Sequence, residues 1–338
     1  MAWYHMTGVD QDVVLYTEVR LARNLHAYPF THRLDATGAK EIITRAGGVL
    51  EANGFTKTDF ADISRAEAYS LAERQYASLA FVKKSLPHAL YLNEPCSMSV
   101  MLCEEDHINL QCILAGRALP EAYDSVSRVE GQLDERLDMA FSEEWGYLSP
   151  IPNHTGSGLQ VSVLLCLPAM TDAGQTDRLM AELLGAGIAL RAVCDERGRP
   201  VGCLFCMNYR PQAYQSESEA LDFIDGLLQT IIDEERALLS TGASSTDEQR
   251  TDRIMRSLGI LRYARLIGVP ELLDLLADVR LGVRLGVVAD VGMEALTALM
   301  IETLPATLSL SEVHEASTPQ ADVAARASCV RERMRTVS

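Results

Sequence analysis

The sequence lacks a surplus of positive charge. Its 338 residues include 30 Lys and Arg against 47 Asp and Glu, which gives a formal net charge of −17. A general nucleic-acid binder needs excess Lys and Arg to neutralise phosphates, so the composition argues against that class. With 48% hydrophobic and 23% charged residues, the chain is typical of a globular protein. Its length allows one large domain and one smaller domain.

Long apolar runs are also missing. The longest candidates, 158–170 and 281–301, are too short or contain Arg, Asp and Glu, whereas a membrane span needs about 18 or more apolar residues. The first residues, MAWYHMTGVDQD, include acids and show no basic-then-apolar export signal. We therefore predict a cytoplasmic protein without a membrane partner.

A disulfide framework is not expected either. The eight cysteines of a cytoplasmic chain of this length are predicted to be reduced thiols. Only Cys203 and Cys206 form a C-x-x-C pair, and no second pair or spaced histidines complete a zinc site. Their apolar context, GCLFCM, favours a buried strand, so we predict no metal ligands from the protein itself.

Apolar spacing predicts helices and strands in a mixed order. Helical spacing occurs at 38–53, 62–86, 119–142, 172–186 and 215–239. The runs 98–102 and 107–114 are typical of two antiparallel strands joined by an acidic turn. A buried strand is predicted at 159–168, after a loop at 146–158, and a hairpin at 188–195 and 201–208.

The stretch 240–252 is polar and rich in small residues, which is typical of a linker. Short Leu- and Val-rich runs from 254 to 306 predict a small all-helical unit, and the tail 311–338 becomes helix-compatible again. We therefore predict two domains, 1–240 and 253–338.

Four segments carry a family resemblance. DVVLYTEVRLARNL (12–25), CEEDHINLQC (103–112), WGYLSPIPNHTGSGLQVSVLLCLP (145–168) and RSLGILRYARLI…DVRLGVRLGVV (256–288) occur in this order. Together they resemble the McsB-type protein arginine kinases, bacterial relatives of the ATP:guanido phosphotransferases (phosphagen kinases). The resemblance implies an α+β fold, in which an antiparallel sheet flanked by helices precedes a small all-α C-terminal domain.

The same resemblance implies an activity and its partners. Mg-ATP would phosphorylate arginines of client proteins and so mark them for a Clp protease. An McsA-like zinc-binding activator, a Clp unfoldase, and a homodimer or a heterodimer with a related kinase are the expected partners.

Phosphoryl transfer to a guanidinium needs carboxylates to take its proton and cations to hold the triphosphate. By this resemblance, Glu104, Glu105 and Asp106 match the family's acidic turn, and Glu105 takes the position of its catalytic base. Glu196 takes the position of a second glutamate that binds the substrate. Without the family match, a solvated turn would be the better interpretation of these acids. The residues assigned to ATP are Thr17, Arg20, Lys84, Asn109, Gln160, Ser162 and Arg191.

The cation set departs from the family pattern. Glu18, Asn109 and Gln160 stand where the family has arginines. One unit charge about 5 Å from a phosphate oxygen, at an effective dielectric near 20, is worth roughly 3 kcal/mol before screening. Each 1.36 kcal/mol is tenfold in rate, so three losses predict very slow transfer or none. Transfer could be restored only if Lys84, Arg23, Arg197 or Arg199 reaches the phosphate site, although Arg197 and Arg199 are more typical of solvated turn residues.

Two further motifs involve histidines and the C-terminal tail. His107 belongs to the acidic turn and is expected to support it, whereas His154 has no spaced partner and is typical of a packing histidine. In the tail, Asp322 and Arg326 match part of the family's phosphoarginine-binding motif, but its leading Arg is absent.

Three functions stay open at this point. The chain is either a divergent protein arginine kinase or a pseudokinase that modulates a partner kinase, an activator or a Clp unfoldase. A kinase for free guanidino metabolites is the weaker third, because the C-terminal helical domain is of the McsB type.

Overall fold

A computed structural model describes residues 2–60, 62–94, 97–211, 215–241, 245–311 and 319–335. Its centre is an eight-stranded sheet in the order β2-β3-β4-β5-β1-β8-β10-β9, in which every neighbouring pair is antiparallel. The strands are β1 (Val14–Arg23), β2 (Phe55–Asp59), β3 (Ala89–Asn93), β4 (Met98–Leu102), β5 (Ile108–Ala115), β8 (Leu159–Cys166), β9 (Ala189–Cys194) and β10 (Pro200–Tyr209). A small separate hairpin joins β6 (Phe141–Ser142) and β7 (Gly146–Tyr147).

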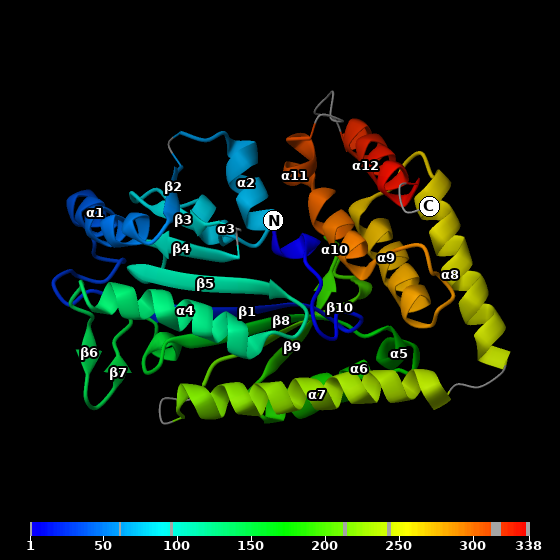
Figure 1. The fold of residues 1–338 in the computed structure, drawn as a ribbon, viewed down its shortest axis with the longest axis horizontal. Coiled ribbons are helices and arrows are strands. Elements are labelled where there is room, and N and C mark those ends of the chain that lie inside the picture. The colour runs from blue at the N-terminus through cyan, green and yellow to red at the C-terminus, as the bar shows by residue number, and fades with distance from the viewer. Residues whose placement is uncertain are drawn as a thin grey trace.

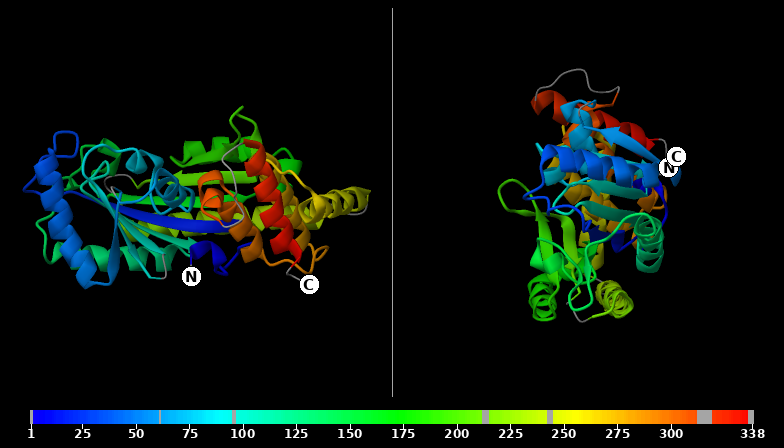
Figure 2. Two further views of the ribbon diagram at one scale, coloured as in Figure 1. Left: turned by 90° about the horizontal axis from the view of Figure 1, so that it is seen from above. Right: turned by 90° about the vertical axis from the view of Figure 1, so that its left-hand side faces the viewer.

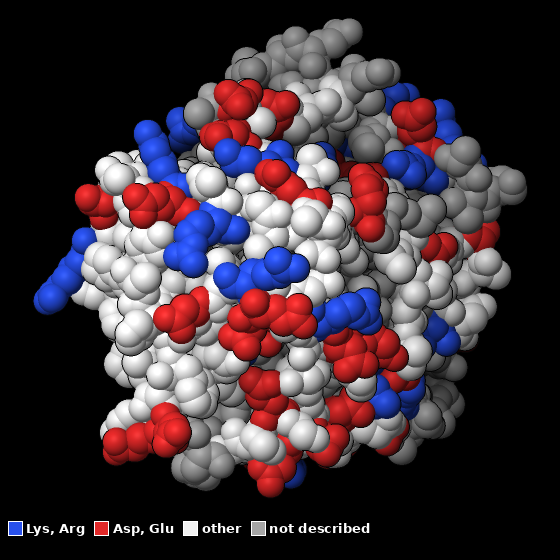
Figure 3. Space-filling view, turned by 60° about the vertical axis from the view of Figure 1, so that its left-hand side comes forward, with Lys and Arg blue, Asp and Glu red and all other residues white. Residues whose placement is uncertain are grey.

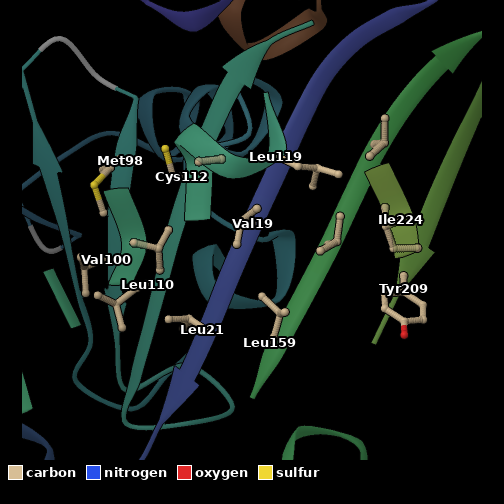
Figure 4. Packing of buried hydrophobic residues seen from close by; sticks show 14 of the residues in the cluster. Val19, Leu21, Met98, Val100, Leu110, Cys112, Leu119, Leu159, Tyr209 and Ile224 are labelled. Atoms are coloured by element: carbon tan, nitrogen blue, oxygen red, sulfur yellow. The ribbon is translucent and has the colours of Figure 1, made fainter. Parts of the chain in front are cut away.

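One face of the sheet is apolar along its whole width. Side chains alternate along a strand, so Val19 and Leu21 of β1 point to this face together with Leu110 and Leu159 of the neighbouring strands (Figure 4). Four helices cover it: α1 (Ala36–Ala52), α4 (Leu119–Asp134), α6 (Thr176–Gly185) and α7 (Glu217–Thr241). Removing these side chains from water is the main stabilising term of the fold.

The opposite face is divided between apolar and polar side chains. Its apolar end packs against η1 (Trp3–His5), α3 (Leu79–Val82) and the C-terminal helices in one buried cluster that includes Tyr16, Leu164 and Leu204. These helices are α8 (Ser245–Tyr263), α9 (Val269–Arg284), α10 (Met293–Glu302) and α12 (Pro319–Arg335), and α11 (Pro305–Ser309) lies against α2 (Arg65–Glu73). They gather at one end of the molecule, with α1 at the other (Figures 1 and 2).

The predicted fold class is confirmed, and so are both predicted hairpins, β4–β5 and β9–β10. The prediction of one helix over 62–86 is wrong. That stretch forms α2 and the short α3, separated by a bend at which Gln75 has a positive φ of 64°.

The linker prediction is wrong over 240–241, which end α7, and over 245–252, which begin α8. Residues 242–244 of the predicted linker, and 312–318 and 336–338 of the tail, lie outside the described residues. In the part of the chain that the structure describes, no helix is both long and apolar enough to span a membrane.

Candidate functional site

Polar side chains form a row across the centre of the divided face. In the strand register, Arg20 of β1 lies between Gln111 of β5 and Gln160 of β8. Glu18 lies beside Ser162, which in turn pairs with Asn208 of β10. Residues directly opposite on antiparallel strands share a face, so the register alone brings these groups together.

A cavity of about 700 Å³ opens at the β8–β10–β9 end of this row. Three of the predicted ATP residues, Gln160, Ser162 and Arg191, line it, together with Asn208 and Arg210. The lining includes two guanidinium groups and no Asp or Glu. We call it the arginine pocket; its chemistry suits an anion with several oxygen acceptors.

Sequence reasoning missed Arg210. Its guanidinium Nη2 donates to Oε1 of Gln160 at 2.9 Å, which places a cation beside the glutamine that the resemblance aligns with an arginine. The available signal was its spacing: Arg210 follows Asn208 by two residues at the end of β10, so it continues the same face.

The first strand supplies less positive charge than its sequence suggests. Arg20 donates to the carboxylate of Glu18, whose side chain is only 5% exposed. Burial disfavours the Arg20 guanidinium, but the carboxylates of Glu18 and Glu104 outweigh that effect and raise its pKa. The Glu18 carboxylate therefore compensates the one charge that β1 retains here.

The three acids of the β4–β5 turn have different surroundings. Glu104 is buried and accepts from Ser78 and from Nδ2 of Asn109, the latter at 2.6 Å. Asp106 is fully buried and accepts from Asn24 and Ser149, both at 2.6 Å. In contrast, the Glu105 side chain is exposed and has no hydrogen bond or ion pair among the described residues.

A buried hydrogen-bond chain links this turn to the arginine pocket. Nδ1 of His154 lies 2.7 Å from Oδ2 of Asp106, and its Nε2 lies 3.2 Å from the amide nitrogen of Gln160. Because the amide can only donate there, Nδ1–H donates to Asp106. Burial raises the pKa of Asp106, but the bonds from His154, Ser149 and Asn24 outweigh it and lower the pKa. His154 is thus more than the packing histidine that the sequence indicated.

His107 holds the turn from the other side. Its Nδ1 accepts from the Leu25 amide and its Nε2 donates to the Pro29 carbonyl, each at 3.0 Å. Burial lowers the pKa of this imidazole. The ring therefore acts as a neutral brace.

The other predicted residues lie apart from the pocket. Thr17 points to the apolar face, where its hydroxyl donates to the Gly116 carbonyl at 2.7 Å. Lys84 donates to the Glu104 carbonyl and lines a separate cavity. Glu196 is exposed in the β9–β10 turn, near the Val14 end of β1, whereas Glu105 lies beyond the Arg23 end. Nine residues of strand correspond to roughly 30 Å, so these two acids are not brought together.

None of the other replacement cations considered at the sequence level enters the pocket lining. Arg23 is buried against Glu130 at 2.9 Å and the Ser157 carbonyl at 2.7 Å. Arg199 is held by Asp195 and by Asp274 of α9, and Arg197 is exposed in the same turn.

The predicted phosphoarginine residues lie in α12. Arg326 is 3% exposed and donates to the carbonyls of Thr303 and Ile267, at 2.9 and 3.2 Å, while Asp322 is half-buried one turn earlier. Burial lowers the pKa of Arg326, although Asp322 and Glu73 oppose this. Within the described ranges, no group of three or more His, Cys, Asp and Glu side chains is placed to hold a metal ion.

Comparisons with known proteins place the chain in a family. The profile of the ATP:guanido phosphotransferase C-terminal catalytic domain matches residues 40–238. The profile of the protein-arginine kinase McsB C-terminal domain matches residues 247–338. The chain belongs to the protein-arginine kinase family.

Relatives match along almost the entire chain. The protein-arginine kinase of Symbiobacterium thermophilum is 33% identical over 98% of this chain and 96% of its own. That of Brevibacillus brevis is 32% identical over 99% and 95%, respectively. Among solved structures, lombricine kinase superposes with a TM-score of 0.60 at 15% identity over 70% of each chain, which supports the fold alone. The family resemblance drawn from the sequence is therefore confirmed.

Proposed function

We propose that this family member transfers the terminal phosphoryl group of ATP to arginine side chains of proteins, and that transfer is slow. The P–O bond to the leaving ADP would break as a P–N bond to the guanidinium forms. Glu105 would take the displaced guanidinium proton, since its carboxylate is the one in the acidic turn not already engaged by described residues.

The arginine pocket supports the nucleotide side of this proposal. Arg191 and Arg210 would hold the triphosphate, with Ser162 and Asn208 as hydrogen-bonding partners. Mg²⁺ would enter with the nucleotide and neutralise part of its charge. The Glu18–Arg20 ion pair is the reason to expect slow transfer, because it leaves β1 without a free cation.

The family resemblance extends the proposal to the cell. Client proteins would be marked for a Clp protease in the cytoplasm, and an McsA-like activator and a dimeric assembly would support the kinase.

A second candidate rests on the same ion pair. If the neutralised β1 site prevents transfer altogether, the chain would be a pseudokinase that modulates a partner kinase, its activator or a Clp unfoldase. In that case the buried hydrogen-bond chain through Asp106 and His154 would serve the fold only.

Phosphoarginine formation tests the proposal. The purified chain is incubated with Mg-ATP and an arginine-containing unfolded protein, and phosphoarginine is scored by mass spectrometry under non-acidic conditions. Glu105→Gln should lower formation by about a hundredfold or more, the usual contribution of a general base, with Mg-ATP affinity unchanged. Glu143→Gln, at another exposed glutamate, is the matched control. Nucleotide binding without any phosphoarginine would favour the pseudokinase.

A further inference from the structure

A cavity of about 990 Å³ that the proposed function does not use lies between α1, β2, α2 and the segment after α3. The sequence contains four lysines among its 30 basic residues. All four, Lys40, Lys57, Lys83 and Lys84, line this cavity. Arg65 lines it as well, and Asp59 is the one acidic residue in the lining. We call it the lysine cavity.

This gathering is unusual for the chain. Its net charge is −17, and Asp and Glu predominate over the lower part of the face shown in Figure 3. Four ammonium groups around one cavity repel one another unless an anion compensates them. Within the described residues, carboxylates offset little of this charge: Lys57 pairs with Asp59 at 3.1 Å, whereas Lys40 and Lys83 have no acidic partner.

The choice of lysine indicates the kind of anion. Arginine pairs two-pronged with planar carboxylates and with phosphates, whereas lysine binds an anion as a compact point charge. Every other residue among the 30 Lys and Arg of the chain is an arginine. A phosphate group carries up to about two negative charges where a carboxylate carries one, so four ammonium groups around one cavity favour phosphate groups over the carboxylates of an acidic peptide.

The volume of the cavity and the aromatic residues beside it restrict the possible ligands further. The volume lies at the upper end of the range for small-molecule pockets and exceeds what a single phosphate fills. His88 and Phe60 both line the cavity, and the His88 ring contacts the rings of Phe60 and Phe81, with centroids 4.9 and 4.7 Å away. Its Nδ1 bonds the Leu86 carbonyl, and its buried Nε2 has no hydrogen-bond partner in the described ranges. A polar ligand atom would satisfy it.

We propose that the lysine cavity binds a small molecule that carries two or more phosphate groups. The site is distinct from the arginine pocket, with which it shares no lining residue. Lys84 joins it to the acidic turn, because its ammonium also donates to the Glu104 carbonyl. The proposal does not depend on phosphoryl transfer by this chain.

Amine acetylation followed by mass spectrometry tests this proposal directly, because every lysine of the chain lines the cavity. Inorganic tripolyphosphate is the probe, and the α-amino group of the chain is the internal reference. We expect tripolyphosphate to slow acetylation of Lys40, Lys57 and Lys83 several-fold while the α-amino group reacts unchanged. Sulfate at the same ionic strength should give no such protection. Equal protection by sulfate, or protection by polyglutamate instead, would overturn the assignment.

Two double variants with the same change of charge provide a second test of the lysine cavity. Lys40→Gln/Lys83→Gln removes two exposed cations of the cavity, and Arg178→Gln/Arg256→Gln removes two exposed cations of α6 and α8. Tripolyphosphate affinity, measured by calorimetry, should fall about tenfold in the first variant only, the size expected for two solvent-screened charges. An equal loss in both variants would mean that net charge, rather than this cavity, attracts the anion.

ATP is the second probe in the acetylation experiment. Protection of the lysines by tripolyphosphate and by ATP means that the phosphate groups suffice for binding, and protection by ATP alone means that the nucleoside is required.

Discussion

The carboxylate of Glu18 lies next to the guanidinium of Arg20, and both side chains project from β1 onto the polar row. A neutral residue at position 18 would leave Arg20 free to attract a phosphate. The acid instead engages that cation and adds a repulsive charge beside the arginine pocket. The Glu18 side chain therefore weakens the attraction for a phosphate in both of these ways.

Replacing Glu18 should make part of the positive charge of Arg20 available to a phosphate. In Glu18→Gln, we expect Mg-ATP affinity to rise about tenfold, because a released unit charge about 5 Å from a phosphate oxygen is worth roughly 3 kcal/mol before screening. Calorimetric titration with Mg-ATP measures the effect. Glu143→Gln, with the same change of charge at an exposed turn, should leave affinity unchanged, and equal affinities in both variants would refute the role of Glu18.

The fully buried Asp106 gives a pH dependence at the residue scale. Its hydrogen bonds lower the pKa of the folded carboxyl, although burial opposes this. A lowered folded pKa adds stability that is complete above the unfolded value near 4 and is lost as the pH falls through the folded pKa. Urea unfolding between pH 3 and 6 should therefore show an acid loss of stability that is weaker in Asp106→Asn. The same slope in both proteins would contradict this assignment.

At the scale of elements, α7 joins the sheet domain to the C-terminal helices. Glu235 of α7 is fully buried and accepts from the backbone amides of Ala169 and Met170, each at 2.8 Å, at the start of α5 (Pro168–Asp172). Arg284 of α9 lies 3.6 Å from the same carboxylate. Burial raises the pKa of Glu235 to about 7, although these amides and Arg284 oppose the shift.

This junction predicts a second, opposite pH dependence. Because the folded carboxyl holds its proton up to about pH 7 and the unfolded one only to about pH 4.3, stability should fall as the pH rises between these values. The loss should reach about 3–4 kcal/mol, at 1.36 kcal/mol per pH unit. Urea unfolding from pH 4.5 to 7.5 measures it, with Glu235→Gln as the comparison. A variant that keeps the full slope would exclude Glu235 as its source.

Elements with strong periodicity could be predicted from the sequence, and weakly patterned ones could not. The alternating apolar residues of β4 and β5 predict that hairpin, and the structure confirms it. In contrast, β2 (Phe55–Asp59) is largely exposed and has no apolar alternation, so nothing indicated a strand. The break between α2 and α3 occurs at Gln75, whose left-handed backbone is uncommon for a residue other than glycine.

At the scale of the whole molecule, one sheet is shared by two apolar clusters. The C-terminal helices pack on the apolar end of the divided face, and η1 completes that cluster with the fully buried Trp3. Neither cluster can lose its partner elements without exposing part of the sheet to water. We therefore expect one cooperative unfolding transition.

A core truncation in the C-terminal helices tests this coupling. Leu296→Ala in α10 removes a fully buried side chain and should lower the free energy of unfolding by about 2–5 kcal/mol. Far-ultraviolet circular dichroism and the fluorescence of Trp3, in a Trp145→Phe background, should shift together in urea. Separate transitions for the two signals would mean that the helical part unfolds independently.

Long-range geometry explains which site residues the sequence could indicate. The acidic turn and Arg191 were identified by their motifs. Arg210, just after β10, meets Gln160 of β8 across the sheet. Glu18 and Arg20 are two residues apart on β1 and share one face of it, but whether they form an ion pair depends on their side-chain conformations. The link from Asp106 to His154 spans 48 residues, so no local pattern revealed it. Register and packing, rather than residue identity, decide which cations face the pocket.

Calorimetry measures whether the arginine pocket binds Mg-ATP. The wild type should bind Mg-ATP at millimolar concentration or below. Arg191→Gln/Arg210→Gln should weaken Mg-ATP binding by about tenfold to a hundredfold. Each exposed cation contributes up to about 1 kcal/mol, and more when the bound nucleotide shields the ion pair from water. Arg197→Gln, in the exposed β9–β10 turn, should bind as the wild type does. Unchanged affinity in the double variant, or no binding by the wild type, would contradict this account.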